Sequence, residues 1–426
     1  MNNLYKIFVI AFIISYPGFC GAGELKFSRP DNYRSFYYET ISFKDSGTID
    51  LNGAWEYRIQ GVKNWHEIEI PASWSGYHGT VIFRKQFTLP VEYEDKVIKL
   101  RALGVSRKCK VRLNDDLISP LEYGGFEILL PAGSLKFGRK NQLEIVVDNV
   151  LKPLNTIPPR SGVLHSEGYG GIIGDIFLRI EDEYLYDEVY ISSVLEPDLS
   201  SGEVIITVHA NTDRVSADTG FDYKLISSDN KTAAEGRFSL TGGTTEYQFS
   251  VPNPGLWSPH NPILYKLEIF KAGSNTPVHC CELGFKRLSF EDNFIRLNNE
   301  PVKIKGLRYY AQTVDGAVLK AEDFESDVKL MLQAGANSIL LTGMPHPYLL
   351  QLCDRRGIIV FLSSEIIGAP VVLMKREEYF NQVVQYINRM ISDYYQHPSI
   401  AAWGVGLDLQ KSFPVLKVGS MLKQRD

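Results

Sequence analysis

Acidic and aromatic side chains stand at the ends of apolar segments in the last third of the chain. Asp408 comes shortly after the apolar run Ile400–Val405, and Trp403 lies within that run. Tyr309 and Tyr310 follow an earlier segment of the same kind. A carboxylic acid can donate or accept a proton, and an aromatic ring can stack on a flat ligand face or pack in a core. These residues form a candidate site, with plain packing an equal alternative for the three aromatic side chains.

The elements that must position these residues alternate between strands and helices. Predicted helices have apolar residues on one face, and glycine follows the first two. The predicted helices cover residues 323–334, 348–356 and 377–395, and the predicted strands cover 302–306, 338–341, 358–362 and 400–405. Solidly apolar strands that alternate with helices are typical of a parallel sheet covered by helices. Residues after these strands should therefore gather at one edge of the sheet.

The chain before this α/β region is predicted to be rich in β-strands. Short alternating runs separated by turn residues indicate a sandwich or jelly roll over residues 23–183. Residues 184–288 have the length and pattern of a seven-stranded sandwich. Trp55 and Trp74 are expected to be core residues. Cys109, Cys280, Cys281 and Cys353 show no disulfide or zinc spacing, so we expect buried, unpaired thiols.

Several motifs resemble glycoside hydrolase family 2, the group of β-galactosidases, β-glucuronidases and β-mannosidases. They are Leu51–Glu56, Pro71–Trp74, Phe83–Phe87, Val111–Asn114, Gly170–Asp175, Leu256–Tyr265 and His397–Asp408. The resemblance implies a jelly-roll sugar-binding domain over 23–183 and an immunoglobulin-like β-sandwich over 184–288. It also implies the first half of a (β/α)8 TIM barrel over 289–426, with a β-linked glycan or oligosaccharide as partner.

The same resemblance assigns roles to individual carboxylates. Asp408 stands at the position of the general acid/base, where the family pattern ends in Asn-Glu and this chain has Leu407-Asp408. Retaining glycosidases need a second carboxylate about 5–5.5 Å away, which in the family follows a later strand. Asp175 matches a residue that reaches toward the sugar in some members, and a plain turn or strand-end carboxylate is the competing interpretation. Glu365 is the nearest alternative carboxylate by position, and a plain loop role is the competing interpretation.

Other polar positions of the family pattern are replaced here. Gly306–Ala311 stands where the family has Gly-Val-Asn-Arg-His-Glu, and Leu340 and Gly343 stand in place of an Arg and a His. Two functions follow as alternatives: a β-glycosidase that hydrolyses O-glycosyl bonds, or a non-catalytic glycan-binding or scaffolding relative. A decaying gene product without a folded function is a third.

A barrel of this type needs eight strands, and the pattern predicts four. Half a barrel would leave open sheet edges, which invite pairing with other chains. We therefore expect a fragment of a longer product, or else a homo-oligomer or a partner that covers the half barrel.

Charge and the N-terminus bear on partners and location. The net charge is −5 and no basic block is present, which argues against nucleic acid. No metal or cofactor motif is recognisable. Lys6, the apolar run Ile7–Ile14 and small residues near Ala22 indicate a signal peptide over 1–22 and export to the periplasm or the extracellular space. A lipid anchor at Cys20 is a weaker alternative, because Phe19 precedes it.

Overall fold

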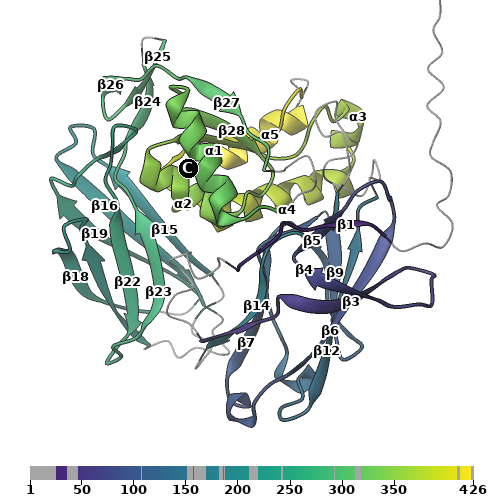
Figure 1. The fold of residues 1–426 in the computed structure, drawn as a ribbon. Helices are drawn as coiled ribbons and strands as arrows, with labels where there is room; N and C mark the ends of the chain where they lie inside the picture. The colour runs from purple at the N-terminus through teal and green to yellow at the C-terminus, as the bar shows by residue number, and fades with distance from the viewer. Residues whose placement is uncertain are drawn as a thin grey trace, which may run out of the picture.

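The structure is a computed structural model. It describes residues 25–35, 47–106, 108–150, 157, 169–181, 186, 188–210, 219–240, 243–291, 293–311, 318–409 and 413–423. The predicted signal peptide and Cys20 lie outside these residues. Figure 1 shows two β-domains, with an α/β domain lying against both of them. In the part of the chain that is described, no helix has the length and apolar character needed to cross a membrane.

The first domain is built from three antiparallel sheets. Their orders are β10-β9-β12-β6-β3-β4, β11-β7-β14-β2 and β1-β5-β13-β8. The strands are β1 Phe27–Ser28, β2 Gly47–Asp50, β3 Gly53–Ile59, β4 His66–Ile70, β5 Ala72–Trp74, β6 Thr80–Thr88, β7 Val97–Ala102, β8 Val105–Ser106, β9 Lys108–Leu113, β10 Asp116–Tyr123, β11 Phe126–Leu129, β12 Lys140–Asp148, β13 Gly170–Ile172 and β14 Ile176–Glu181. Trp55 and Trp74 are buried in the core between these sheets, which confirms the prediction.

The second domain is a sandwich of a three-stranded sheet, β15-β16-β19, and a four-stranded sheet, β18-β17-β22-β23. The strands are β15 Glu188–Leu195, β16 Ser201–His209, β17 Gly220–Ile226, β18 Thr232–Ser239, β19 Thr244–Pro252, β20 Trp257–Ser258, β21 Asn261–Pro262, β22 Tyr265–Lys271 and β23 Pro277–Leu283. Alternate residues of the strands in these two sheets point between them and form one apolar core, whereas β20 and β21 form a separate two-stranded sheet. The four cysteines Cys109, Cys280, Cys281 and Cys353 are buried thiols, as predicted.

The third domain contains a parallel sheet, β27-β28-β29-β30, after a small antiparallel sheet, β24-β25-β26. The strands are β24 Leu288–Glu291, β25 Phe294–Leu297, β26 Glu300–Pro301, β27 Gly306–Arg308, β28 Ser338–Thr342, β29 Ile359–Ser363 and β30 Ile400–Gly404. The helices are α1 Ala321–Gln333, α2 Pro347–Arg356, α3 Val371–Met374, α4 Glu377–Tyr394 and α5 Phe413–Lys423. The apolar face of α4 packs in the core of this domain, as its spacing predicted.

The first parallel strand is shorter than expected. A strand was predicted over 302–306, but β27 begins only at Gly306. The Asn337 side chain accepts a hydrogen bond from the Lys305 backbone N–H at 2.7 Å and donates one to the Lys303 carbonyl at 2.8 Å. These side-chain bonds satisfy the backbone that a strand partner would otherwise pair.

Candidate functional site

The His-Pro-Ser segment before β30 is a buried anchor for that strand. The Asp354 carboxylate, on α2, contacts His397 Nδ1 and accepts a hydrogen bond from the Ser399 backbone N–H at 2.9 Å. All three residues are less than a tenth exposed. Because a buried carboxylate must be hydrogen-bonded, this cluster fixes where β30 enters the sheet.

The other end of β30 carries Asp408. The Leu407 backbone bonds to the loop after β29, with its N–H donating to Ile366 and its carbonyl accepting from Gly368, both at 2.9 Å. Asp408 itself is exposed and has a φ of 53°, in the left-handed region. Its backbone is thus held at the carboxyl edge of the sheet, while its side chain faces solvent.

A cavity of about 210 Å³ lies between the first domain and the carboxyl ends of β27 and β28. The α/β domain contributes residues from three strand ends and from α1 and α4, and the first domain contributes residues beside β8 and β13 and Gly124 between β10 and β11. The lining includes Gly104, Ser106, Gly124, Tyr169, Gly174, Tyr309, Tyr310, Met344, His346, Glu365 and Tyr386. In open α/β sheets, ligands bind outside the carboxyl ends of the strands, which is where this cavity lies.

Glu365 brings a carboxylate to the wall of this cavity. It follows β29, and its side chain lies over Gly343 at the end of β28. A Cβ atom placed on Gly343 would be 2.5 Å from Glu365 Oε1, and the φ of Gly343 is 90°. The missing side chain at Gly343 is therefore what leaves room for the Glu365 carboxylate.

The two predicted tyrosines both line the cavity. The Tyr309 hydroxyl donates a hydrogen bond to Asp327 Oδ2, on α1, at 2.8 Å, and burial raises the pKa of Tyr309. Its ring, rather than its hydroxyl, is what a ligand would meet. The Arg308 guanidinium carbon lies 4.9 Å from the centroid of the Tyr310 ring, a cation–π distance.

His346 is a lining residue that the sequence did not single out. Its Nδ1 accepts a hydrogen bond from the Tyr348 backbone N–H at 3.2 Å, so the side chain caps the start of α2. Burial, and to a smaller extent the charge of Arg101, lowers the pKa of His346 to about 3. The imidazole is therefore neutral near pH 7. Its place directly after Pro345 at a strand end was the available signal.

Two of the other predicted site residues lie behind the cavity wall or away from it. Asp175 is fully buried, and its Oδ1 accepts hydrogen bonds from Tyr33 Oη and Asn52 Nδ2, each at 2.9 Å. Burial and the adjacent Asp175 charge raise the pKa of Tyr33. Trp403 is partly buried and packs against the α/β core. Neither residue, nor Asp408, is among the cavity's described lining residues, whereas Tyr309, Tyr310 and Glu365 are.

Within the described residues, no group of three or more His, Cys, Asp or Glu side chains is arranged to hold a metal ion. The polar side chains among the described lining residues are the Glu365 carboxylate, the neutral His346 imidazole and several hydroxyl groups. Such a lining can exchange hydrogen bonds with a hydroxyl-rich ligand while its rings pack against the ligand's apolar face.

Comparison with models of known protein families identifies the family of this chain. Residues 288–426 match the profile of Glycosyl hydrolases family 2, TIM barrel domain, and residues 184–286 match that of Glycosyl hydrolases family 2. The chain belongs to glycosyl hydrolases family 2. The resemblance seen in the sequence motifs is thereby confirmed.

The relatives of this chain include proteins named for more than one sugar. The chain is 23% identical over 400 residues to a protein of Formosa agariphila named putative β-glucuronidase. The aligned residues cover 87% of this chain and 47% of the relative. The chain is also 25% identical over 328 residues to a β-galactosidase of Thermoanaerobacterium thermosulfurigenes. Here the alignment covers 74% of this chain and 45% of the relative. The chain thus spans about half the length of these curated relatives.

Solved structures share the fold. A β-D-glucuronidase from Dictyoglomus thermophilum superposes with a TM-score of 0.74 at 21% identity, covering 89% of this chain and 70% of that one. A family 2 β-galacturonidase from Eisenbergiella tayi, bound to galacturonate, gives a TM-score of 0.74 at 23% identity, covering 92% and 70%.

Proposed function

We propose that this protein recognises a β-linked glycoside and that the cavity at the ends of β27 and β28 holds one of its sugar rings. The observation that carries the proposal is the convergence of Tyr310, His346 and Glu365 on this cavity, with first-domain residues as the opposite wall. The cavity, about 210 Å³, is smaller than the roughly 300–1,000 Å³ of sites for drug-sized ligands. That size suits a single ring.

Hydrolysis would follow the retaining β-glycosidase scheme, with Asp408 as acid/base and, as nucleophile, the second carboxylate that the family places after a later strand. Asp408 follows a parallel strand, as the acid/base does in the family pattern, but Asp has one methylene fewer than Glu, and here it is exposed and outside the described cavity lining. A shift of about 1 Å at a reacting centre can lower a rate by about 10²-fold. We therefore expect hydrolysis through Asp408 to be slow.

Non-catalytic glycan binding is the second candidate, and Leu407 favours it. The family pattern places at that position an Asn that contacts the sugar beside the acid/base. The Leu407 side chain cannot form a hydrogen bond, and Asp408 is exposed. In this case sugar binding would persist without turnover.

The proposal also covers the fold type of each domain, the location of the protein and its assembly. We infer that the first domain is a jelly roll, the second an immunoglobulin-like sandwich and the third the opening half of a TIM barrel. Export, and a homo-oligomer or partner that covers the parallel sheet, stay predictions.

One pair of assays tests both candidates on the full chain. Isothermal titration with methyl β-D-glucuronide, β-D-galacturonide and β-D-galactoside measures binding, and release of 4-nitrophenol from the matching glycosides measures hydrolysis. We expect Glu365→Gln to weaken binding about tenfold, the loss of one charge-assisted hydrogen bond, and Asp408→Asn to leave binding unchanged. Asp115→Asn, at the exposed turn between β9 and β10, is the matched control for loss of a carboxylate.

The outcomes separate the two candidates. Hydrolysis that Asp408→Asn abolishes supports the glycosidase, and binding without hydrolysis supports the glycan-binding relative. Absence of binding to every glycoside, or equal weakening by Glu365→Gln and Asp115→Asn, would refute the cavity as the sugar site.

A further inference from the structure

The turn between β10 and β11 forms part of the cavity wall. Gly124 lies in this turn and lines the cavity, and its carbonyl accepts a hydrogen bond from the Val105 N–H at 2.9 Å. A Cβ atom on Gly124 would be 3.2 Å from both Cβ and Sδ of Met344, at the end of β28. The turn therefore packs against the loop that follows β28, and its position sets how far apart the two walls of the cavity stand.

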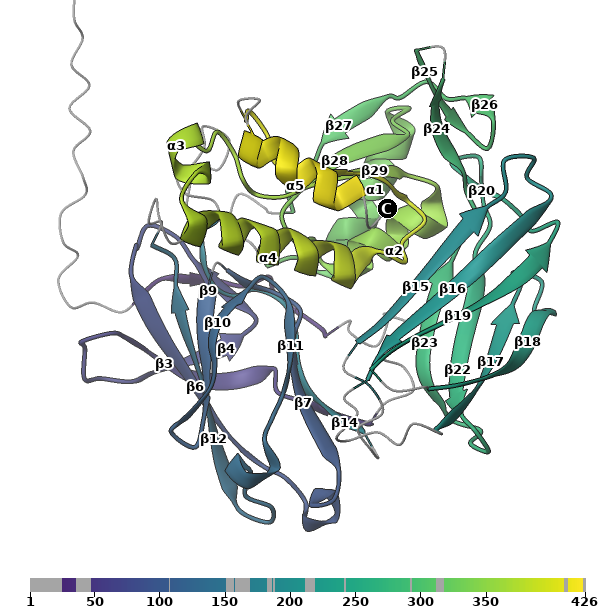
Figure 2. The same ribbon diagram turned by 180° about the vertical axis from the view of Figure 1, so that it is seen from behind.

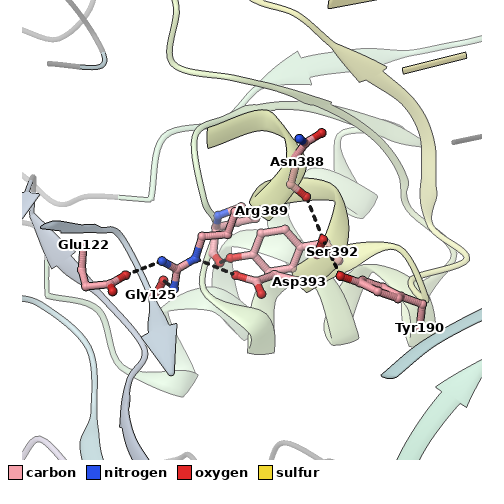
Figure 3. Close-up of polar contacts among 9 residues, drawn as sticks. Glu122, Gly125, Tyr190, Asn388, Arg389, Ser392 and Asp393 are labelled. Atoms are coloured by element: carbon pink, nitrogen blue, oxygen red, sulfur yellow. Dashed lines mark hydrogen bonds and ion pairs between the residues drawn. The ribbon is translucent and has the colours of Figure 1, made fainter. Parts of the chain in front are cut away.

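Arg389, on α4, holds that turn from behind. Its guanidinium donates to the Glu122 carboxylate and, through Nη2, to the Gly125 carbonyl at 2.8 Å. Its Nε lies 3.6 Å from Asp393 Oδ2 one helical turn later. Figure 3 shows Arg389 between Glu122 and Asp393, so that one planar guanidinium joins the helix to the first domain.

The helix that carries Arg389 also supplies the cavity's opposite side. Tyr386, one turn before Arg389 on α4, is buried and lines the cavity. Figure 2 shows α4 lying along the face of the α/β domain that meets the two β-domains. Residues from one short stretch of helix thus contact the ligand space directly and anchor the turn that closes it.

We propose that Arg389 is a positioning residue for sugar recognition, acting through Glu122 and Gly125 to fix the β10–β11 turn against Met344. It does not touch the ligand. This inference rests on the proposed function of the cavity, and it assigns the width of the sugar site to a contact between domains.

The surroundings of Arg389 allow its effect on sugar binding to be measured separately from its effect on the stability of the fold. Glu122, Arg389 and Asp393 border a second, polar cavity of about 600 Å³ at the junction of the three domains. If a shorter side chain replaces Arg389, water can therefore hydrogen-bond to Glu122 and Asp393, which would otherwise be buried without a partner. On the same helix, Ser392 Oγ donates to the Tyr190 hydroxyl of β15 at 3.2 Å, a contact with the second domain that leads away from the first cavity.

The test compares Arg389→Gln with Ser392→Ala as the matched control, both in the full chain. We expect Arg389→Gln to raise the dissociation constant for the bound methyl glycoside about tenfold, and Ser392→Ala to leave it unchanged. Arg389→Lys should restore part of the affinity, since a lysine can pair with Glu122 but lacks the fork that also reaches Gly125. Hydrogen exchange of the Val105 amide, which needs no ligand, should be faster in Arg389→Gln alone.

These readouts distinguish the two proposals. If the wild-type chain binds no glycoside but Arg389→Gln still speeds exchange at Val105, the sugar site is wrong and the anchoring of the turn stands. If the chain binds and Arg389→Gln matches wild type in affinity and exchange, the positioning role is wrong. Equal loss of affinity in Arg389→Gln and Ser392→Ala would also overturn it, because it would indicate general loosening of α4.

Discussion

The two ends of β30 differ in what holds their side chains. At the amino end, His397 and Ser399 are buried and bonded to the Asp354 carboxylate of α2. At the carboxyl end, the Leu407 backbone bonds to Ile366 and Gly368, and Asp408 is exposed. One motif thus combines a buried, hydrogen-bonded anchor with an exposed carboxylate.

This difference explains how the family frame persists while its polar residues change. Replacing a buried, bonded side chain leaves its partners without hydrogen bonds, which lowers the free energy of unfolding. Replacing an exposed side chain at a strand end has little such effect. The fold therefore constrains His397 through its contacts, whereas at position 408 it constrains the backbone, whose φ of 53° favours Asp, Asn or Gly.

Removal of the Asp354 carboxylate should have the largest effect. In Asp354→Ala, His397 Nδ1 and the Ser399 N–H lose their partner inside the protein. We expect the free energy of unfolding to fall by about 3 kcal/mol, measured by urea denaturation followed through tryptophan fluorescence. Asp408→Asn is the paired variant at the other end of the motif, because asparagine tolerates the left-handed backbone of this position, and its expected change is below about 0.5 kcal/mol. Similar losses in the two variants would contradict the contrast between the two ends.

Acid should destabilise the chain through two histidines in domain contacts. Burial lowers the pKa of His346 to about 3 and, with the charge of Arg179, that of His279 to about 4. The folded state then binds fewer protons than the unfolded state between these values and about 6.5. The stability of the neutral rings is full above pH 6.5 and is lost as the pH falls toward 4, by at most about 1.4 kcal/mol per pH unit for each histidine.

The variant His346→Gln isolates one of these contributions. Denaturation at a series of pH values from 6.5 to 5 should give a shallower slope for the variant than for the wild type, and the carboxylates that titrate in both proteins cancel in the comparison. Glutamine can still accept the hydrogen bond from the Tyr348 N–H. Parallel slopes would mean that His346 takes up a proton in the folded state as readily as in the unfolded one.

The sequence predicted the fold where local signals are strong. The predicted helices 323–334, 348–356 and 377–395 correspond to α1, α2 and α4, because apolar periodicity and the glycines after two of them mark their limits. The four-residue helix α3 was not predicted, since one turn has no periodicity to detect. β27 begins later than predicted because Asn337, distant in sequence, bonds the backbone before it.

The candidate site was predictable only in part, for a related reason. Tyr309 and Tyr310 line the cavity because any residue after a parallel strand lies at that edge of the sheet. The place of Glu365 depends on the missing side chain of Gly343 on a different strand, and that of Asp175 on hydrogen bonds to Tyr33 and Asn52. Such contacts exist only after folding and leave no local pattern.

Two glycines allow a second comparison between a residue that the fold requires and a residue of the candidate site. Gly357 ends α2 with a φ of 70°, and a Cβ there would be 2.3 Å from the Pro259 carbonyl of the second domain. Backbone cannot move aside, so Gly357→Ala should lower the free energy of unfolding by about 2–3 kcal/mol.

Gly343 also has a positive φ, but the Cβ atom added in Gly343→Ala would contact a side chain instead of backbone. Its Cβ would lie 2.5 Å from Glu365 Oε1, the far end of a flexible side chain that can rotate away. We expect a loss of stability of only about 1 kcal/mol, from the positive φ, together with severalfold weaker glycoside binding as the Glu365 carboxylate leaves the cavity wall. Thermal denaturation and titration of both variants check this. If Gly343→Ala destabilised the chain as much as Gly357→Ala and left affinity intact, Glu365 would belong to the scaffold rather than to the sugar site.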